Sequence, residues 1–380
     1  MKQSALIYSE NQLGQLDGKV TNGLVRHSDK YKIVGVIDST KAGMDAGEFL
    51  DGRKNSIPVF SSTEDALKRL DYIPKHFIYG IAPLESYLNQ EQRQIILNAM
   101  SMGMNIVNGL PEFFTDDQEF VQKALEYGVH INDIRKPLPR KDLHIFKGNI
   151  FNVKTPIVAV LGTDCAVGKR TTAVQLVEEL QQRNLKTAFI ATGQTGLLQG
   201  AKYGTSVDVL SSGFNTGEVE NEILKAVETD HPDIIIVEGQ GALSHPAFTS
   251  STAIVRGANP KAIILQHPPK RKNRCDFPEI PMPTLKSEID LVEMVSGAKV
   301  IALTINHEDM TSHELEDTIM DYENKYKVPT MDVLKHGCEK IIDSLFEQFP
   351  NLITGKTNKH VSKIVMEQIP KLQKPYRVSQ

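Results

Sequence analysis

A short stretch near the middle of the chain constrains the fold most. Residues 156–161 form an apolar run (PIVAVL), Gly162 and Gly168 bound the turn that follows, and Lys169 opens a segment compatible with a helix. This order is the context of a phosphate-binding loop, in which a lysine and backbone N–H groups at a helix N-terminus face an anion. The sequence therefore predicts a parallel α/β unit with a phosphate site where this strand ends.

The loop differs from the standard motif in its length and in the residue after its lysine. Five residues separate Gly162 from Gly168, where the standard motif has four, and Arg170 stands where a Ser or Thr hydroxyl would hold Mg²⁺. Arg170 is itself a possible bidentate phosphate ligand, whereas the Thr171 hydroxyl points about 100° away on a helix. We therefore expect a loop that holds a phosphate rather than one that presents a metal triphosphate for transfer. The residues expected to bind the ligand are Gly162, Thr163, Asp164, Val167, Gly168, Lys169, Arg170 and Thr171.

Short apolar runs alternate with amphipathic segments in the first third of the chain. The amphipathic segments at 91–102 and 118–127 have apolar residues three or four apart, and Gly103 and Gly128 follow them as left-handed helix caps. The expected strands, rich in Ile, Val and aromatic residues, lie at 4–8, 32–37, 76–81 and 105–107. This alternation predicts a parallel sheet covered by helices on both faces.

A second alternation of the same kind follows a proline-containing connection. Pro137 and Pro139 exclude a helix or a central strand there, so we place the linker at 136–153. The later apolar runs are nearly continuous, as strands buried on both faces should be, and lie at 157–161, 188–191, 234–237, 262–265 and 300–305. The sequence thus predicts two α/β domains, at residues 1–140 and 150–370.

Composition limits the partners and the compartment. The 380 residues include 43 Lys and Arg against 47 Asp and Glu, a net charge of −4, so the chain lacks the strong positive field of nucleic-acid-binding proteins. It has no apolar run of the ~18 residues that cross a membrane and no signal-peptide core, and its three cysteines are too scattered for a disulfide framework or a zinc cluster. We expect a cytoplasmic homo-oligomer that acts on a small molecule and binds no metal, nucleic acid or membrane.

Side chains with useful chemistry follow three expected strands, whose carboxyl ends line the ligand crevice of a parallel sheet. Three roles are open for Glu238, which lies in a glycine-flanked turn. It could ligate Mg²⁺, it could act as a general base if burial raises its pKa, or it could be a solvated turn residue. Gln194 and Thr195 lie in a loop of small residues that a ligand can approach closely. The alternative is a connecting loop with no role in binding. His267 precedes a basic cluster that includes Arg271. This cluster suits a phosphate or carboxylate ligand, and a solvated basic loop is the alternative.

The first domain lacks the glycine fingerprint of a dinucleotide fold. Residues 9–19 contain no Gly-x-Gly-x-x-Gly, only a turn with Gly14, Gly18 and Lys19 that opens a helix. Asp38, at the end of the second expected strand, stands where a Rossmann acid binds a ribose. Because the glycines are missing, we do not expect nicotinamide binding.

Several of these segments together resemble the D-glutamate N-acetyltransferase family. The matching segments are GTDCAVGK at 162–169, ATGQTG at 191–196, VEGQG at 237–241, His245-Pro246 and His267-Pro268. The resemblance covers nearly the whole chain and implies a Rossmann-like parallel-sheet N-terminal domain followed by a P-loop NTPase-like α/β domain. The loop and the Glu238 turn also resemble those of dethiobiotin synthetase, an ATP-dependent ligase with the same five-residue spacing.

The family resemblance implies transfer of an acetyl group from acetyl-CoA to the amine of D-glutamate or a related amino acid. The loop would then hold phosphates of coenzyme A, which need binding but no cleavage. A base must take the ammonium proton and donors must stabilise the oxyanion, and the expected bases are Glu238 first and then His245. The residues expected to bind the substrate are Gln194, Thr195, Gln240, His267 and Arg271.

Two other functions stay open on the sequence alone. An ATP- and Mg²⁺-dependent ligase or kinase of the dethiobiotin-synthetase type is favoured by Glu238 as a Mg²⁺ ligand and disfavoured by Arg170. A nucleotide-binding regulatory protein without turnover is the second alternative. Binding of acetyl-CoA and binding of Mg–ATP are the observations that separate these functions.

Overall fold

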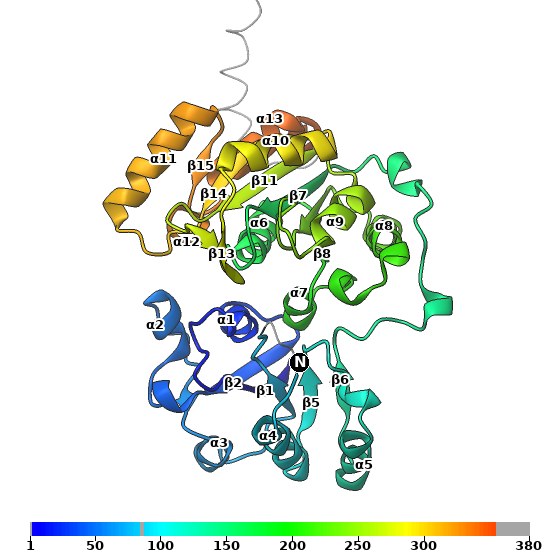
Figure 1. The fold of residues 1–380 in the computed structure, drawn as a ribbon, viewed down its shortest axis with the longest axis vertical. Helices are drawn as coiled ribbons and strands as arrows, with labels where there is room; N and C mark the ends of the chain where they lie inside the picture. The colour runs from blue at the N-terminus through cyan, green and yellow to red at the C-terminus, as the bar shows by residue number, and fades with distance from the viewer. Residues whose placement is uncertain (1, 84–86, 355–380) are drawn as a thin grey trace, which may run out of the picture.

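The first sheet has the strand order of a dinucleotide-binding fold. The computed structural model describes residues 2–83 and 87–354 (Figure 1). The first sheet contains six parallel strands in the order β3-β2-β1-β4-β5-β6, which is the Rossmann order. These strands are β1 (Gln3–Tyr8), β2 (Tyr31–Ile37), β3 (Val59–Phe60), β4 (His76–Tyr79), β5 (Asn105–Asn108) and β6 (Ile131–Asp133).

Helices cover both faces of this sheet because its strands are apolar on both. Successive side chains of a strand point to opposite faces: Leu6 and Tyr8 pack with Phe77 on one side, whereas Ala5 and Ile7 belong to a separate buried group on the other. The helices are α1 (Lys19–Arg26), α2 (Ala46–Asp51), α3 (Thr63–Leu70), α4 (Gln90–Ser101) and α5 (Gln118–Tyr127), with 3₁₀ turns η1 (Ser39–Lys41) and η2 (Phe114–Asp116).

The helix ends predicted from glycines are confirmed. Helix α5 begins after Asp117, whose carboxylate accepts hydrogen bonds from the amides of Glu119 and Phe120, and it ends at Gly128 in the left-handed region. Gly103, just after α4, has a φ of 84°, which costs glycine little because it lacks a Cβ atom. Local capping thus fixes where these two helices stop.

The second sheet contains seven parallel strands in the order β15-β14-β11-β7-β10-β8-β9. Its central strand β7 is buried along its whole length, as expected for a strand covered on both faces. The strands are β7 (Ile157–Gly162), β8 (Thr187–Ala191), β9 (Tyr203–Gly204), β10 (Ile234–Glu238), β11 (Ala262–His267), β14 (Lys299–Ile305) and β15 (Thr330–Met331).

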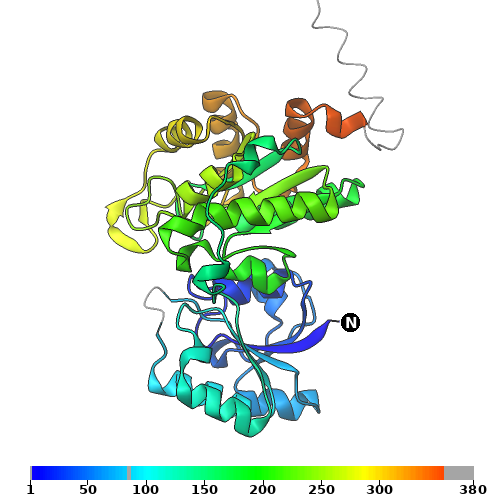
Figure 2. The same ribbon diagram turned by 90° about the vertical axis from the view of Figure 1, so that its right-hand side faces the viewer.

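Helices again lie on both sides of the second sheet (Figure 2). They are α6 (Lys169–Gln182), α7 (Gln194–Gln199), α8 (Ser212–Asp230), α9 (Ser250–Ala258), α10 (Leu285–Ser296), α11 (Ser312–Tyr326), α12 (Val333–His336), α13 (Glu339–Gln348) and α14 (Asn351–Thr354). A small antiparallel hairpin, β12 (Asn273–Arg274) and β13 (Phe277–Pro281), follows β11. The connection between the sheets runs from 134 to 156 with 3₁₀ turns η3 (Arg140–Asp142) and η4 (Asn149–Asn152), and a further turn, η5 (Val207–Val209), precedes α8.

The strands predicted from apolar runs are confirmed, with ends that differ by one or two residues. Six strands were not predicted. Four of them, β3, β6, β9 and β15, are two or three residues long, too short to show a periodic pattern, and the other two form the small hairpin β12–β13. The class of fold is also confirmed, as two parallel α/β units. The last part of the predicted second domain, residues 355–370, lies outside the described residues.

The two units meet where α1 packs against α7, with the carboxyl edges of both sheets turned toward this contact (Figure 1). The Gln199 amide donates to the backbone oxygens of Gly23 and His27, at 2.9 and 3.1 Å. Nδ1 of His27 lies 2.6 Å from a carboxylate oxygen of Glu178, and Arg135 forms an ion pair with Asp208. Polar side chains from both units therefore hold α1 beside the second sheet.

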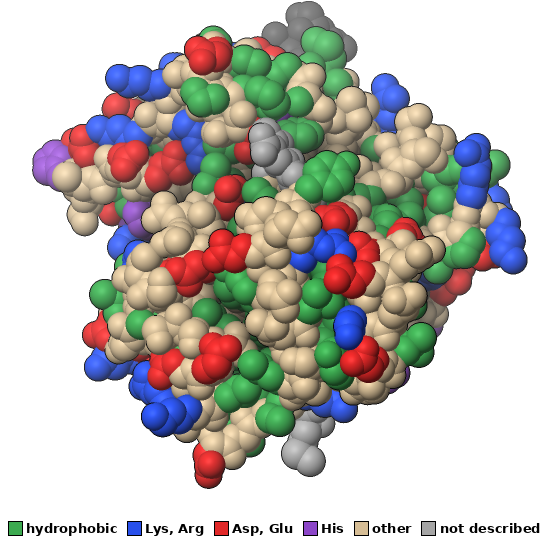
Figure 3. Space-filling view, turned by 60° about the horizontal axis from the view of Figure 1, so that its bottom comes forward, with side chains coloured by type: hydrophobic (Ala, Val, Ile, Leu, Met, Phe, Trp, Pro, Cys, Tyr) green, Lys and Arg blue, Asp and Glu red, His purple; other side chains and the backbone are tan. Residues whose placement is uncertain are grey.

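The surface seen from the side of the first unit carries interspersed acidic and basic side chains (Figure 3). Mixed charge of this kind is ordinary for a protein surface with a small net charge. Among the described residues, no helix has the length and apolar character needed to cross a membrane.

Candidate ligand site at the phosphate loop

The phosphate loop, defined as residues 163–168, connects β7 to α6 in the predicted order of strand, loop and helix. A Cβ atom at Gly162 would lie 2.8 Å from Val167 Cγ2 and 2.9 Å from Lys169 Cδ, so only glycine permits this close folding of the loop onto its strand. Gly168, with a φ of 105°, turns the chain into the helix. Ala166 also has a positive φ, of 49°. The glycine pattern therefore has a direct steric cause.

Several hydrogen-bond donors at the start of α6 have no protein acceptor. Within the described ranges, the backbone N–H groups of Ala166, Val167 and Gly168 donate to no acceptor. The ammonium group of Lys169 is buried and donates to the backbone oxygen of Asp164 at 2.6 Å. Burial lowers the pKa of this lysine. Open amides, a helix N-terminus and a lysine suit an anion such as a phosphate.

Arg170 lies between the phosphate loop and the first unit. Its guanidinium donates one long hydrogen bond, 3.4 Å, to the backbone oxygen of Lys19 at the start of α1, and a Cβ atom at Gly23 would lie 2.5 Å from its Nη2. Burial lowers its pKa, and the charge of Glu238 opposes that effect. Arg170 therefore faces the gap between the units and keeps most of its five donors for a further partner. Thr171, next in the helix, is partly buried.

Asp164 anchors the phosphate loop to the segment after β11. Its fully buried carboxylate accepts from Arg271 and from the amide of Cys275, both at 2.9 Å, and lies 3.5 Å from Arg274. These hydrogen bonds and charges outweigh burial and lower the pKa of Asp164. The guanidinium of Arg271 is also bonded to Glu308, at 2.7 and 2.8 Å. We call Asp164, Arg271, Arg274 and Cys275 the loop clamp.

Arg271, which we expected to bind the substrate, is paired within the loop clamp, so its role in substrate binding stays a prediction. Arg271 has two acidic partners of its own, and Arg274 donates to the backbone oxygen of Thr163 at 2.6 Å. Lys270 likewise pairs with Glu314. The sequence shows the cluster of cations but gives no sign of the distant carboxylates that neutralise it. Asp164, expected to bind the ligand, instead positions the loop.

His267, at the end of β11, positions the phosphate loop rather than facing the open amides. Its Nδ1 lies 2.9 Å from the hydroxyl oxygen of Thr163, and burial lowers its pKa to about 4. The imidazole is therefore neutral at physiological pH. Beside it, Gln266 accepts hydrogen bonds from the hydroxyls of Thr172 and Thr304, at 2.6 and 2.5 Å. The Thr172 hydroxyl is thereby used within the protein.

Glu238 ends β10, the strand next to β7, so its carboxylate lies beside the phosphate loop. It is 6% exposed, and the backbone N–H of Thr192 donates to it at 3.1 Å. Burial raises its pKa, while the charge of Arg170, the Thr192 amide and the charge of Lys169 oppose the rise. A buried carboxylate with a raised pKa next to an anion site has the properties of a general base.

Gln194, Thr195 and Gln240 lie at the same carboxyl edge of the sheet. Gln240 donates to the backbone oxygen of Thr192 at 2.6 Å, which ties the Glu238 turn to the end of β8. Gln194 and Thr195 form the first turn of α7, and a Cβ atom at Gly23 would lie 3.0 Å from Thr195 Cγ2. These predicted residues are therefore brought to the contact between the units, beside Arg170.

His245 is buried, and its hydrogen bonding favours a role as a donor. The backbone N–H of Ala247 donates to its Nδ1 at 3.2 Å, so in the neutral ring the proton is on Nε2. Burial and the charge of Arg274 lower its pKa. Its Nε2 has no hydrogen-bond partner among the described residues and lies 3.7 Å from Asp164. This geometry favours His245 as a donor, and its assignment as the second candidate base stays a prediction.

One group of potential metal ligands is present among the described residues, but its surroundings disfavour a cation. Asp164, Cys165 and His245 offer ligand atoms within 4.8 Å of one another. The carboxylate of Asp164 is already bonded to Arg271 and lies beside Arg274, and these positive charges repel a metal ion. The prediction that the site holds no metal stays a prediction.

The carboxylate of Asp38, in the first unit, is hydrogen-bonded within that unit. It accepts from the amide of Leu13 at 3.0 Å and from the hydroxyl of Thr40 at 2.6 Å, and the residue is fully buried. These bonds hold the segment between β1 and α1. The carboxylate is thus used within the protein, and the expectation that the unit binds no nicotinamide dinucleotide stays a prediction.

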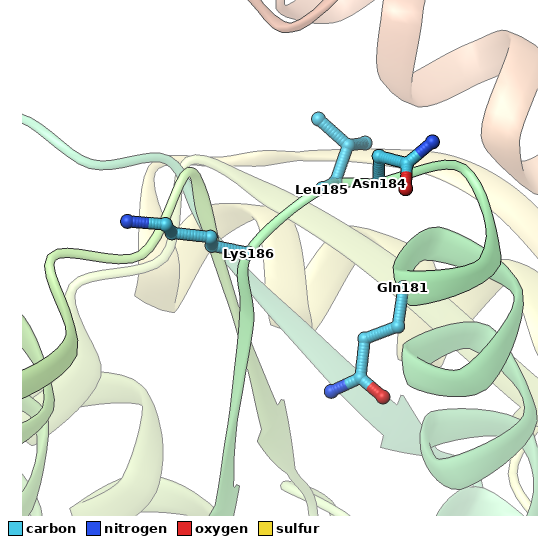
Figure 4. Close-up of a pocket in the computed structure, with 4 residues that line it drawn as sticks. All are labelled: Gln181, Asn184, Leu185 and Lys186. Carbon is cyan, nitrogen blue, oxygen red and sulfur yellow. The ribbon is translucent and has the colours of Figure 1, made fainter. Parts of the chain in front are cut away.

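A surface depression lies away from these residues, beside the end of α6 (Figure 4). It is lined by Gln181, Asn184, Leu185 and Lys186. These residues precede β8, so the depression is at the amino edge of the sheet, opposite the phosphate loop. It has no cluster of titratable groups and takes no part in the candidate site.

The site and the fold define a two-domain α/β protein in which a P-loop domain follows a Rossmann-like domain. Two family models match the chain: a domain of unknown function described as the DUF1611_C P-loop domain, over residues 144–342, and the DUF1611_N Rossmann-like domain, over residues 39–137. The chain belongs to this family. A DUF1611 family protein from Anabaena variabilis has a similar crystal structure, with a TM-score of 0.83 and 27% identity, covering 91% of this chain and all of that chain.

Two relatives with named activities are similar over most of their length. A protein of Pseudoalteromonas sp named D-glutamate N-acetyltransferase is 30% identical over 279 residues, which cover 71% of this chain and 81% of the relative. One from Tritonibacter scottomollicae with the same name is 28% identical over 277 residues, with the same shares covered. These similarities confirm the family resemblance inferred from the sequence motifs.

Proposed function

We propose that the protein is an amino-acid N-acetyltransferase that moves an acetyl group from acetyl-CoA to the amine of D-glutamate or a related amino acid. The observation that carries the proposal is the anion site without a metal-binding hydroxyl: three open amides with Lys169 and Arg170, beside buried Glu238. Coenzyme A has phosphates to be held but not cleaved. The names of the two relatives support the same chemistry.

In the proposed reaction, Glu238 takes the proton from the substrate ammonium group. The neutral amine nitrogen then attacks the thioester carbon, and an oxyanion forms on the acetyl oxygen. The proposed oxyanion donors are Nε2–H of His245 and backbone amides of the 193–196 or 239–241 turns. The carbon–sulfur bond breaks as the oxyanion collapses, and coenzyme A leaves as a thiolate. The thiolate takes the extra proton that the attacking nitrogen still carries, and Glu238 releases the first proton to solvent. The products are an N-acetyl amino acid and coenzyme A.

Arg170 is the proposed partner of a substrate carboxylate in place of Arg271. It lies at the contact between the units and has one long hydrogen bond to the protein, whereas Arg271 is neutralised by Asp164 and Glu308. A guanidinium with free donors binds a carboxylate bidentately. The predictions of a cytoplasmic homo-oligomer that binds neither nucleic acid nor membranes remain part of this proposal.

Product analysis tests the proposed function. The purified protein is incubated with acetyl-CoA and D-glutamate, and mass spectrometry measures N-acetylglutamate while a thiol reagent measures free coenzyme A. We expect the two products in equal amounts, and their loss in Glu238→Gln. A folded wild-type protein that forms neither product from D-glutamate or from other amino acids would refute the proposal.

The ATP-dependent alternative rests on one observation, the position of Glu238 next to the phosphate loop, where a carboxylate can ligate Mg²⁺. Under that alternative, Mg–ATP would be the cofactor and the protein a ligase, a kinase or a regulatory nucleotide-binding protein. Two features oppose it: Arg170 replaces the metal-binding hydroxyl, and the hydroxyl of Thr172 is bonded to Gln266.

A further inference from the structure

A cavity of about 300 Å³ lies between the two units, lined by the connection between the sheets, by the segment after α7 and by α8. None of the phosphate-loop residues lines it. Its volume is at the lower end of the range for small-molecule sites, and contacts between domains are common places for such sites. The cavity is therefore a second candidate site, with chemistry of its own.

Two residues that line the cavity each carry a buried polar atom with no hydrogen-bond partner in the described part of the chain. The first is Nε of Arg135, whose side chain is 11% exposed and pairs with Asp208 through Nη2. The second is the hydroxyl of Ser206, a residue that is 4% exposed. Buried donors and acceptors are nearly always satisfied in folded proteins. An N–H group and a hydroxyl left open on residues that line one cavity point to a polar ligand.

The wall carries charges of both signs. Glu218 and Glu222, four residues apart on α8, lie on one face of that helix. Bonds fix both carboxylates in place: Nδ1 of His144 lies 3.0 Å from Glu218, and the amide of Gly204 donates to Glu222 at 2.9 Å. Lys30, Arg135 and Lys136 line the same cavity from the first unit and the connection. Three of these charged side chains have oppositely charged partners outside the lining: Arg135 pairs with Asp208, Lys136 with Asp116 and Glu222 with Lys225. The cations of the wall would repel a ligand that is only positive, and Glu218 and Glu222 would repel a ligand that is only negative.

We propose that this cavity binds a small zwitterionic amino acid. Its carboxylate would accept from Nε of Arg135 and from the Ser206 hydroxyl, its ammonium group would face Glu218 and Glu222, and its carbon skeleton would contact Leu197. Phosphate groups of a nucleotide or of coenzyme A do not suit the cavity, because two carboxylates line it. The inference goes beyond the proposed function, since it concerns a second site and requires no acetyl transfer.

Titration calorimetry with defined probes tests this proposal. D-Glutamate, L-glutamate and glycine are titrated into the wild type and into Ala201→Leu, which fills the cavity, and Arg135→Gln, which removes a cation from its wall. Ala42→Leu, at an exposed position of the first unit, is the matched control. We expect binding of at least one amino acid, weakened at least 10-fold in both cavity variants and unchanged in the control. Acetate and methylammonium should each bind at least 10-fold more weakly than that amino acid.

Two binding results would overturn the proposal: none of the three amino acids binds to the folded wild type, or Ala201→Leu binds them as the wild type does. Ser206→Ala, which removes only a hydroxyl, keeps the test valid if Arg135→Gln fails to fold. Acetyl-CoA binding, measured on the same variants, should be retained, which separates this proposal from the proposed function. An unchanged KM for D-glutamate in the cavity variants marks the bound amino acid as an effector at a second site, whereas a KM that rises with the loss of binding would place the acetyl acceptor in this cavity and overturn the second-site proposal.

Discussion

Lys169 and Arg170 are neighbours in the first turn of α6, yet they serve different surfaces. Lys169 is buried under the phosphate loop and bonds the backbone oxygen of Asp164, so its remaining donors are available to an anion at the loop. Arg170 points to α1 of the first unit. At this scale the site divides into a phosphate region and a region between the units, with Glu238 beside both.

Removing the lysine should weaken the binding of the phosphate-bearing ligand. A hydrogen bond to a charged group contributes about 1.5–3 kcal/mol, so Lys169→Ala should raise the acetyl-CoA dissociation constant by about 10- to 150-fold. Titration calorimetry measures it. Lys270→Ala, in the exposed ion pair with Glu314, should leave the constant unchanged. Equal affinities for Lys169→Ala and the wild type would refute the phosphate-loop assignment.

The raised pKa of Glu238 predicts a specific pH dependence of turnover. A general base acts when it is deprotonated, so the rate should fall as the pH drops through a pKa above the ordinary value for glutamate. Glu238→Gln should lower the rate by about 10²- to 10⁴-fold and remove this acid limb. Rates measured from pH 4 to 9 test both points. Glu288→Gln, which alters another buried carboxylate with a raised pKa, should keep the limb.

The same substitution has an effect on stability that does not depend on catalysis. Because the pKa of Glu238 is higher in the folded chain than in the unfolded chain, ionisation costs more in the folded protein. Its contribution to stability is therefore greatest at low pH and is lost as the pH rises. Glu238→Gln should melt above the wild type at pH 8, and the difference should shrink at pH 4. A lower melting temperature at pH 8 would contradict the buried position of Glu238.

Residue identity predicted the phosphate loop but not the partners of its neighbours. Gly162, Gly168 and Lys169 are recognisable because the motif is local in sequence. The role of Arg271 could not be predicted, because its partner Asp164 is 107 residues away in the sequence and comes close only when β7 and β11 are side by side. The hydrogen bond of His245 is local, to the amide of Ala247, but no motif indicates it. Gln199, whose amide bonds two α1 carbonyls, has no motif at all.

At the scale of elements, the segment from β11 to the β12–β13 hairpin holds the phosphate loop through the loop clamp. Breaking a buried ion pair by removing one partner costs about 3–5 kcal/mol, so Arg271→Ala should lower the free energy of unfolding by that amount. Lys270→Ala, next to it but exposed, should change it by about 0–1 kcal/mol. Urea unfolding at pH 7 measures both. A loss below 1 kcal/mol for Arg271→Ala would show that the clamp does not stabilise the loop.

Elements long enough to bury a continuous apolar face could be predicted from sequence. β7 is apolar along its length and β11 is apolar up to Leu265, and α5 combines spaced apolar residues with Asp117 and Gly128 as caps. Two strands of only two residues each, β3 (Val59 and Phe60) and β15, could not be predicted. So short a strand shows no periodic pattern, and it forms only by pairing with a neighbouring strand of its sheet.

For the whole molecule, the contact of α1 with α7 and Arg170 sets how the two units meet. A Cβ atom at Gly23 would lie 2.5 Å from Arg170 Nη2 and 3.0 Å from Thr195 Cγ2, so Gly23→Leu should push α1 away. We expect a larger radius of gyration in small-angle X-ray scattering and weaker substrate binding. Gly213→Leu is the control, because a Cβ atom there meets no atom within 4 Å. The same radius and affinity in both variants would contradict this role of the contact.

A comparison of acetyl-CoA with Mg–ATP by titration calorimetry tests the central claim most directly. The open amides and Lys169 suit bound phosphates, and Arg170, in place of a metal-binding hydroxyl, disfavours their transfer. We therefore predict that acetyl-CoA binds to the wild type with measurable heat and that Lys169→Ala weakens this binding. Mg–ATP should bind at least 10-fold more weakly than acetyl-CoA. Tight binding of Mg–ATP with no heat from acetyl-CoA would contradict the account.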